Sequence, residues 1–278
     1  MRFGISTHIF HDRRLERDHL AQIAAYGFDS IELFATRSHF DYHDASAIER
    51  LSQWLGETGL TLHSVHAPIT DAFGVHGAAQ YSNAAAAQDR RQAAIREAEA
   101  ALAIARHVPF GVMVVHLGTP SSQNSQDDNH RAHAVRSLET ICEAAAPLDV
   151  RIAAEVIPNR LSDAASLATL LDNDLDATTA GICLDFGHAN LMGEVADAIE
   201  TASEHLITTH IHDNHGRDDE HLVPYLGTID WDLALVTMQK IGYEGTYLME
   251  LAGADRPASV LEEARRARQR FERTLTHA

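Results

Sequence analysis

The stretch that decides the fold is ITTHIHDNHGRDDEH, residues 207–221. It begins as a short β-branched run, typical of a buried strand, and continues into a polar segment. The segment from His210 to His221 holds four histidines and four acidic residues. A solvated acidic loop would account for the carboxylates but not for the imidazoles. The stretch therefore predicts a strand whose end carries side chains that bind metal ions or transfer protons.

Short apolar runs of the same kind recur along the whole chain. The predicted strands are residues 2–7, 30–34, 60–66, 112–117, 150–156, 181–185, 207–212 and 246–251. Stretches with helical spacing lie between them, near residues 15–26, 45–58, 84–106, 130–146, 163–172, 193–203, 231–240 and 258–274. Eight strand signals that alternate with eight helix signals predict an α/β fold, a single (β/α)8 TIM barrel with an outer ring of helices.

One domain spanning residues 1–278 is the expected organisation, because barrels of this type commonly reach this length as one unit. A doubly wound open sheet is the competing topology. It is less favoured, since no glycine-rich G-x-G-x-x-G turn follows the first predicted strand. The segment TPSSQNSQDDN, residues 119–129, is interpreted as a polar loop rather than as a linker.

The charge of the chain argues against a nucleic-acid partner. Its 278 residues include 40 acidic and 22 basic side chains, with a formal net charge of -18, and such a field repels phosphate backbones. No apolar run is long enough for a membrane span, and the N-terminal MRFGISTHIF lacks the apolar segment of a signal peptide. The only cysteines, Cys142 and Cys183, are not in a paired spacing, so a cytoplasmic location is expected.

Side chains of the metal-ligand type fall where most of the predicted strands end. In a TIM barrel the chemistry sits at these C-terminal ends and in the loops that follow them. A lone histidine there is more often a hydrogen-bonded rim residue than a ligand, so the coincidence across distant parts of the chain carries the prediction. The candidates are His8, His66, His116, Glu155, Asp185, His188, His210, His212, Asp219, His221 and Glu250.

Two further assignments stay open, and the other histidines are expected to be solvated. Glu32 is either a rim ligand or a buried hydrogen-bonding partner inside the barrel, and His210 is expected to line the floor beneath a metal ion. The histidines on predicted helices or loops are His11, His19, His39, His43, His107, His130, His133, His205 and His277.

The mixture of imidazole and carboxylate groups indicates a divalent metal such as zinc, manganese or magnesium. A metal held at this rim can polarise a carbonyl group or lower the pKa of a bound water. Two of the carboxylates, Glu155 and Glu250, end different predicted strands. They are the predicted catalytic pair, because carboxylates facing each other across the site can pass a proton on opposite faces of a substrate.

Seven short motifs, in their order along the chain, resemble the xylose-isomerase-like barrel superfamily. This superfamily joins sugar isomerases and epimerases, related dehydratases and the endonuclease IV type of DNA-repair phosphodiesterase. The resemblance covers nearly the whole chain. The motifs are SVHAP (64–68), VVHLG (114–118), AAEV (153–156), LDFGH (184–188), IHDN (211–214), DEH (219–221) and MEL (249–251).

The resemblance implies a metal site at Glu155, Asp185, His212 and Glu250. In ketose epimerases of this group the two glutamates also exchange the proton beside the carbonyl, through a metal-stabilised enediolate. The resemblance further implies that His188 orients the substrate.

In endonuclease IV members the site grows to three ions. The positions that match are His66 and His116, which join Glu155 at one ion, and His188, Asp219 and His221, which hold another. The chain carries all nine positions, so one to three ions are expected.

Two more substrate contacts are predicted at the same rim. Arg217 lies near the place where epimerases of the group have a substrate-binding arginine, although the spacing differs slightly. His8 follows the first predicted strand and is expected to face the substrate.

The leading hypothesis is a metal-dependent isomerase or epimerase of a small sugar or related carbonyl compound. The acidic chain and the absence of a basic stripe favour a small molecule over DNA. The alternatives are an endonuclease IV-like phosphodiesterase, supported by the nine ligand positions, and a dehydratase that starts with the same proton abstraction. A non-catalytic scaffold is least favoured, because a scaffold has no reason to converge ligands at one rim. The sequence is also compatible with a homo-oligomer.

Overall fold

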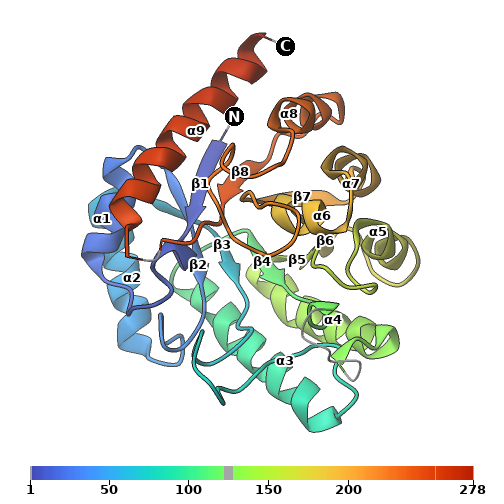
Figure 1. Cartoon of the computed structure of the whole chain (residues 1–278). Helices are drawn as coiled ribbons and strands as arrows, with labels where there is room; N and C mark the ends of the chain where they lie inside the picture. Colours follow the sequence, from blue (N-terminus) through green and yellow to red (C-terminus); the bar gives the residue numbers. More distant parts are fainter. Residues whose placement is uncertain (1, 122–127, 254, 278) are drawn as a thin grey trace.

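Eight parallel strands close into a barrel in the computed structural model of the chain, which describes residues 2–121, 128–253 and 255–277. Each strand pairs with the next along the chain, and β1 pairs with β8 to close the ring. The helices surround the strands (Figure 1). The predicted (β/α)8 TIM barrel is therefore confirmed. The strands are β1 (Arg2–Ser6), β2 (Ser30–Phe34), β3 (Thr61–His66), β4 (Val112–Val115), β5 (Arg151–Glu155), β6 (Ala180–Asp185), β7 (Leu206–Ile211) and β8 (Thr246–Met249).

The helices begin and end close to the predicted positions, with one addition. A short helix, α6, follows β6 directly and contains the last three residues of the LDFGH motif, whose first two residues end β6. Within the described residues no helix has the length and apolar character needed to cross a membrane. The α-helices are α1 (Arg17–Ala25), α2 (Ala45–Thr58), α3 (Gln88–Leu102), α4 (Arg131–Ala145), α5 (Ala164–Asn173), α6 (Phe186–Met192), α7 (Val195–Ala202), α8 (Trp231–Lys240) and α9 (Pro257–His277).

Aspartate caps determine where several helices begin. The carboxylate of Asp44 accepts a hydrogen bond from the backbone N–H of Ser46 at 2.9 Å and starts α2. Asp230 starts α8 in the same way, through the N–H of Leu233 at 3.0 Å. An aspartate at this position satisfies a backbone donor that has no partner within the helix. At the other end of α2, Gly59 adopts a left-handed conformation that stops the helix.

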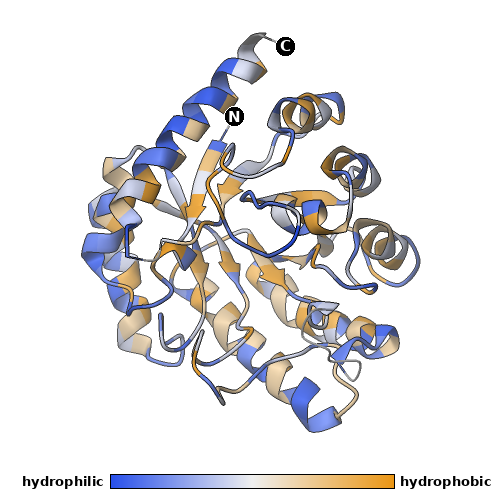
Figure 2. Ribbon diagram, viewed as in Figure 1, coloured by the Kyte–Doolittle hydropathy of each residue, from blue (hydrophilic) through white to orange (hydrophobic). Residues whose placement is uncertain are grey.

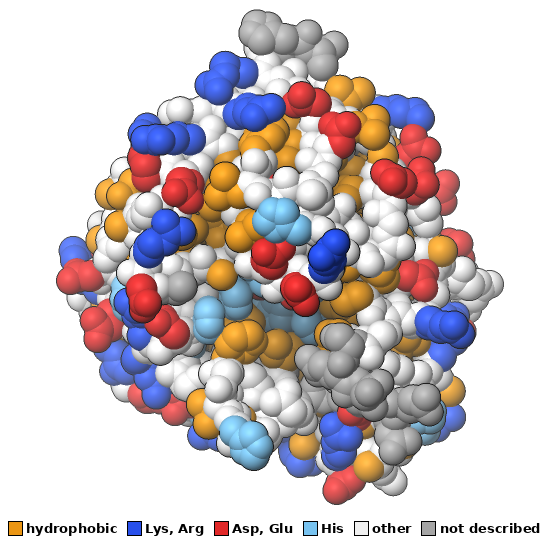
Figure 3. Space-filling view, in the orientation of Figure 1, with side chains coloured by type: hydrophobic (Ala, Val, Ile, Leu, Met, Phe, Trp, Pro, Cys, Tyr) orange, Lys and Arg blue, Asp and Glu red, His pale blue; other side chains and the backbone are white. Residues whose placement is uncertain are grey.

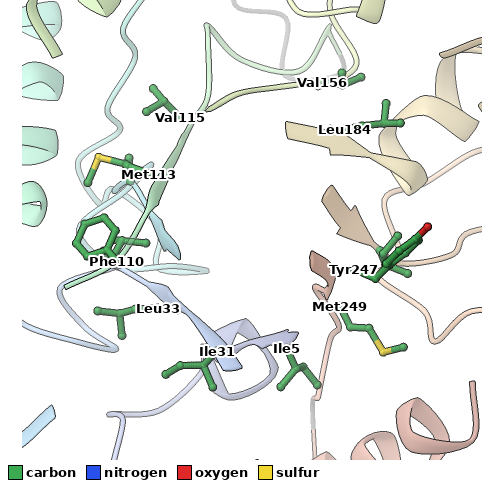
Figure 4. Close-up of a cluster of buried hydrophobic side chains, with 14 of the residues drawn as sticks. Ile5, Ile31, Leu33, Phe110, Met113, Val115, Val156, Leu184, Tyr247 and Met249 are labelled. Atoms are coloured by element: carbon green, nitrogen blue, oxygen red, sulfur yellow. The ribbon is translucent and has the colours of Figure 1, made fainter. Parts of the chain in front are cut away.

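The alternation of side chains along each strand separates an apolar outer layer from a polar interior. In β2, Ile31 and Leu33 pack into the large hydrophobic cluster between strands and helices, and Figure 4 shows them with other members of that layer. Glu32, between them, points to the opposite face, inside the barrel. Figure 2 shows the strands as largely hydrophobic, whereas the surrounding helices alternate between hydrophobic and hydrophilic residues. The fold therefore isolates a few polar side chains in the barrel.

A small apolar plug fills part of the interior. Val112 and Val114 of β4 pack with Ala153 of β5 and Cys183 of β6, separately from the outer hydrophobic layer. The next inward position along β5 is Glu155, and the next along β6 is Asp185. The polar end of the barrel therefore lies directly above a layer of packed apolar side chains.

Candidate metal centre and active site

Five strands deliver ligand-type side chains to one end of the barrel. Glu155 is the last residue of β5, and Asp185 is the last residue of β6. His210 lies in β7, opposite Asp185 in the pairing register. His66 ends β3, and Glu250 follows β8 directly. Since all eight strands run in the same direction, these side chains meet at the C-terminal end of the barrel, where TIM barrels carry their functional sites.

Four buried residues form the centre of this site, and we call them the core cluster. Ligand atoms of Glu155, Asp185, His210 and Glu250 all lie within 4.8 Å of one another. Nδ1 of His210 is 3.4 Å from Oε1 of Glu155 and 3.3 Å from Oε2 of Glu250. In the described part of the chain, Nδ1 of His210 and Oε1 of Glu155 have no hydrogen-bond partner. Because buried polar atoms are normally paired, these two atoms fit a cation at the centre of the cluster.

The core cluster contains His210, whereas the sequence analysis gave this position to His212. β7 ends at Ile211, so His212 lies beyond the strand. Nε2 of His212 lies 2.9 Å from Oδ1 of Asp185 and 3.7 Å from Oδ1 of Asp219. From the sequence, His210 is a candidate expected on the floor beneath the ion, whereas in the structure it lies within the core cluster. Both histidines alternate to the same face, and only the strand register, which sets His210 opposite Asp185, distinguishes them.

Three histidines besides His210 lie around the carboxylate of Glu155. Its Oε2 lies 3.2 Å from Nε2 of His66 and 3.0 Å from Nε2 of His116, and its Oε1 lies 3.3 Å from Nδ1 of His188. Burial opposes ionisation of Glu155, but the imidazoles of His116 and His210 outweigh burial and hold its pKa well below the usual range. Glu155 is therefore ionised, with an imidazole nitrogen within 3.3 Å of each of its oxygens.

A second group of ligand-type residues lies around Asp185 and the loop after β7, and we call it the outer cluster. Nε2 of His188 and Nε2 of His221 each lie 3.2 Å from Oδ2 of Asp219. The rings of His212 and His221 stack with their centroids 4.1 Å apart. Burial disfavours the charged form of His221, but Asp219 outweighs burial and raises the pKa of His221 to about 9. The outer cluster consists of Asp185, His188, His212, Asp219 and His221.

The buried carboxylate of Asp213 accepts hydrogen bonds along the loop that carries part of the outer cluster. Oδ1 of Asp213 accepts hydrogen bonds from the backbone N–H groups of Asn214 at 2.9 Å and Ile229 at 3.2 Å. Its Oδ2 accepts from the N–H of Tyr225 at 3.0 Å and from Nε1 of Trp231 at 2.8 Å. The donors come from both ends of the connection between β7 and α8. Asp213 therefore fixes the shape of this loop.

A cavity of about 180 Å³ opens onto the site. Glu155 and Glu250 lie on its polar side, and Figure 3 shows histidine side chains gathered in a hollow near the middle of the face in view. Phe34 and Phe73 form an aromatic wall with His8, whose ring lies 4.9 Å from Phe34 and 5.7 Å from Phe73 between centroids. The cavity thus combines titratable groups with aromatic surface.

Of the three residues predicted to contact the substrate, two line the cavity and one does not. His8 lines the cavity, and its Nδ1 lies 3.3 Å from the carbonyl oxygen of Leu251. Burial and the nearby His221 lower the pKa of His8 well below its usual value, so its ring is neutral. His188 also lines the cavity, although it lies in α6 rather than at a strand end. Arg217 is exposed in the loop after β7 and does not line the cavity, so its role stays a prediction.

Two further predictions concern the burial of His39 and the loop at residues 119–129. The prediction that His39 is solvated is wrong: its side chain is fully buried, with Nδ1 2.6 Å from the carbonyl oxygen of Arg13. The segment between β1 and α1, which contains Arg13, lies against this ring, and spacing along the sequence does not reveal such a contact. In the predicted polar loop 119–129, residues 122–127 lie outside the described residues. At its base, the side-chain carbonyl of Asn129 accepts a hydrogen bond from the N–H of Thr119 at 2.9 Å.

Comparison with known proteins places this arrangement in a family. Residues 20–271 match the family model described as xylose isomerase-like TIM barrel. The chain belongs to the xylose isomerase-like TIM barrel family, as the sequence motifs predicted.

Individual proteins are also similar to this chain over most of its length. The uncharacterized protein MJ1311 of Methanocaldococcus jannaschii is 29% identical over 258 residues, covering 90% of this chain and 83% of that protein. Among solved structures, a D-tagatose 3-epimerase-like protein matches with a TM-score of 0.82 and 24% identity, over 100% of this chain and 99% of that one. The D-psicose 3-epimerase of Clostridium cellulolyticum H10 matches with a TM-score of 0.78 and 20% identity, over 99% of both chains.

Proposed function

We propose that the protein is a divalent-metal-dependent isomerase or epimerase of a small sugar or related carbonyl compound. The observation that carries this proposal is the core cluster. In it, Glu155 and Glu250 share one group of ligand atoms with Asp185 and His210, at the edge of one cavity. Two carboxylates beside a metal-binding set are the combination that proton transfer next to a carbonyl group requires.

The core cluster would hold the first ion. One imidazole and three carboxylates suit zinc, manganese or magnesium. When bound, a divalent cation supplies Lewis acidity toward a carbonyl group. The orphaned atoms Nδ1 of His210 and Oε1 of Glu155 support this assignment. His66 and His116 together with Glu155, and the outer cluster, are the candidate sites of two further ions.

Glu155 and Glu250 would move the proton. They enter the cavity from different strands, β5 and β8. One carboxylate removes the proton from the carbon beside the carbonyl, and the electron pair of the C–H bond moves toward the carbonyl oxygen to form an enediolate. Return of a proton by the other carboxylate to the opposite face inverts that carbon. Return of the proton to the former carbonyl carbon, together with transfer of the hydroxyl proton to the former carbonyl oxygen, exchanges ketose and aldose.

The dimensions of the cavity favour a small substrate. Its volume of about 180 Å³ lies below the roughly 300–1,000 Å³ typical of pockets for drug-sized molecules. Phe34 and Phe73 add apolar surface to the lining of the cavity. Apolar surface of this kind offers no hydrogen bonds to water beside the proton that is transferred.

Solvent exchange tests the proposal. A panel of ketoses and aldoses is incubated with the protein and Mn²⁺ or Zn²⁺ in heavy water. Deuterium at the carbon beside the carbonyl, followed by NMR after removal of the metal, is the expected result. Glu155→Gln and Glu250→Gln should each abolish the exchange, while Glu97→Gln on α3 should not. Absence of exchange across a broad panel contradicts the proposal.

A phosphodiesterase of the endonuclease IV type is the second candidate, and the convergence of three metal-binding groups favours it. The core cluster, the outer cluster and the pair His66–His116 on Glu155 together form a polynuclear set. The net charge of -18 argues against a phosphodiesterase that acts on DNA, because binding a duplex needs several cationic contacts to phosphates. Incision of a duplex with an abasic site at low salt distinguishes this reaction. Elimination of water from the substrate would instead indicate a dehydratase.

A further inference from the structure

Glu32 is a fully buried carboxylate that the proposed reaction does not use. It lies in β2, opposite Ser64 of β3 in the pairing register. Its Oε2 accepts a hydrogen bond from Oγ of Ser64 at 2.9 Å and lies 3.1 Å from Nε2 of His210. Placing a carboxylate in a packed interior costs free energy unless its partners compensate for the lost water. The ionisable side chain in contact with Glu32 is that of His210, which is also fully buried.

The two ring nitrogens of His210 face different groups. Nε2 faces Glu32, while Nδ1 faces Oε1 of Glu155 at 3.4 Å and Oε2 of Glu250 at 3.3 Å. Oε2 of Glu32 is a carboxylate oxygen that can accept the proton on Nε2 as well as the hydrogen bond from Ser64. With the proton on Nε2, the lone pair of Nδ1 points at the core cluster, where Nδ1 has no hydrogen-bond partner among residues that the structure describes.

We propose that Glu32 is a positioning residue of the core cluster, which orients His210 and keeps its Nδ1 available as a metal ligand. Histidine ligands commonly donate their second N–H to a carboxylate, which fixes the ring and makes the ligand nitrogen a stronger donor. The chain of contacts runs from Ser64 through Glu32 to His210, so each member supports the next. This inference rests on the proposed function in one respect, that the core cluster binds a metal ion.

A purely structural role for Glu32 makes a different prediction. If Glu32 only fills the interior and satisfies Ser64, then its replacement lowers stability but leaves the affinity for metal unchanged. If Glu32 positions His210, then affinity falls even in a variant that folds normally. Glu32→Gln keeps the size of the side chain and removes its charge. Ser64→Ala leaves the carboxylate in place but removes the donor that fixes its orientation.

Cobalt(II) titration of the full chain, after removal of metals with a chelator, separates the two roles. Competition with a chromogenic chelator gives the affinity of the tightest site, and the visible absorption of Co²⁺ reports the ligand geometry. Thermal unfolding of the metal-free forms verifies that the variants fold. Glu97→Gln is the matched control, since Glu97 is a partly buried carboxylate on α3 that contacts Tyr42 and His43.

The expected result is an affinity about 10–100-fold lower for Glu32→Gln, with an altered Co²⁺ spectrum. Ser64→Ala should shift the affinity in the same direction by a smaller factor, and Glu97→Gln should match the wild type. A folded Glu32→Gln with wild-type affinity and spectrum overturns the inference, and leaves the proposed function standing. If Glu32→Gln does not fold, an unchanged affinity in Ser64→Ala overturns it. A wild-type chain that binds no Co²⁺ overturns both.

Discussion

Nδ1 of His210 lies 3.4 Å from Oε1 of Glu155, and in the described residues neither atom has a hydrogen-bond partner. The two atoms come from β7 and β5, and both are fully buried. A nitrogen lone pair and a carboxylate oxygen facing each other in a buried site are stable together when a cation lies between them. This relationship locates the candidate metal centre deeper in the barrel than the sequence motifs predicted.

Replacement of Gly187 by alanine should damage the outer cluster selectively. A Cβ at this position would lie 2.0 Å from Cε1 of the His212 ring, so the ring has to move. The core cluster does not contain His212. We expect Gly187→Ala to bind fewer ions per chain than the wild type while it keeps the tightest site, as measured by elemental analysis after dialysis.

Gly56 provides the control for this substitution. A Cβ there meets no atom within 4 Å, and Gly56 lies inside α2. Gly56→Ala should raise the free energy of unfolding by up to about 1 kcal/mol and leave the metal content unchanged. Wild-type metal content in Gly187→Ala would show that His212 does not contribute a ligand.

His39 should make the stability depend on pH in a mildly acidic range. Burial lowers its pKa from 6.5 to about 4. The unfolded chain therefore binds a proton at His39 between these values while the folded chain does not, so stability falls as the pH decreases through this window. The loss should reach about 3 kcal/mol near pH 4.

The contribution of His39 to the loss of stability at low pH is the difference between the loss in the wild type and the loss in a variant without this ring. Urea unfolding at pH 7 and pH 4.5 should give a smaller drop in His39→Gln than in the wild type, because the neutral amide does not titrate. His107→Gln, at an exposed position, should keep the full drop. Equal drops in the wild type and His39→Gln would mean that the buried ring does not govern this window.

Asp213→Asn should loosen the loop between β7 and α8. The carboxylate accepts four hydrogen bonds, two at each oxygen, and an amide group replaces one of these acceptors by a donor. Hydrogen bonds to charged groups contribute roughly 1.5–3 kcal/mol each, so the free energy of unfolding should fall by about 3 kcal/mol. Because this loop carries Asp219 and His221, the metal content of the outer cluster should fall as well.

Asp232→Asn, at an exposed position in the first turn of α8, is the control for Asp213→Asn. It should change stability by only a few tenths of a kcal/mol. If Asp213→Asn unfolds at the same urea concentration as Asp232→Asn, then the four contacts do not stabilise the loop.

The sequence predicted the barrel well because the strands carry strong local signals. β2 begins and ends at the predicted residues, and the other strands differ by one or two residues. α6 escaped prediction, since LDFGH continues an apolar strand and the helix that it starts is short. Asp185 initiates that helix by accepting a hydrogen bond from the N–H of His188 at 2.7 Å. The motif thus contains a strand end and a helix cap within a few residues.

The site was harder to predict than the fold because it depends on depth in the barrel. Alternation places His210 and His212 on the same face, but it does not say which ring reaches Glu155. That depends on how β7 is offset against β6, where the register shifts between Ile182 and Cys183. A shift of this kind comes from packing across the whole barrel, and no local pattern records it.

The assignment of His210 to the metal centre is tested by the number of metal ions bound per chain in the wild type, His210→Ala and His212→Ala after identical loading and dialysis. We expect at least one tightly held ion in the wild type, loss of that ion in His210→Ala, and its retention in His212→Ala. A folded His210→Ala variant that still holds its tightest ion with wild-type affinity would show that His210 is not a ligand of that ion.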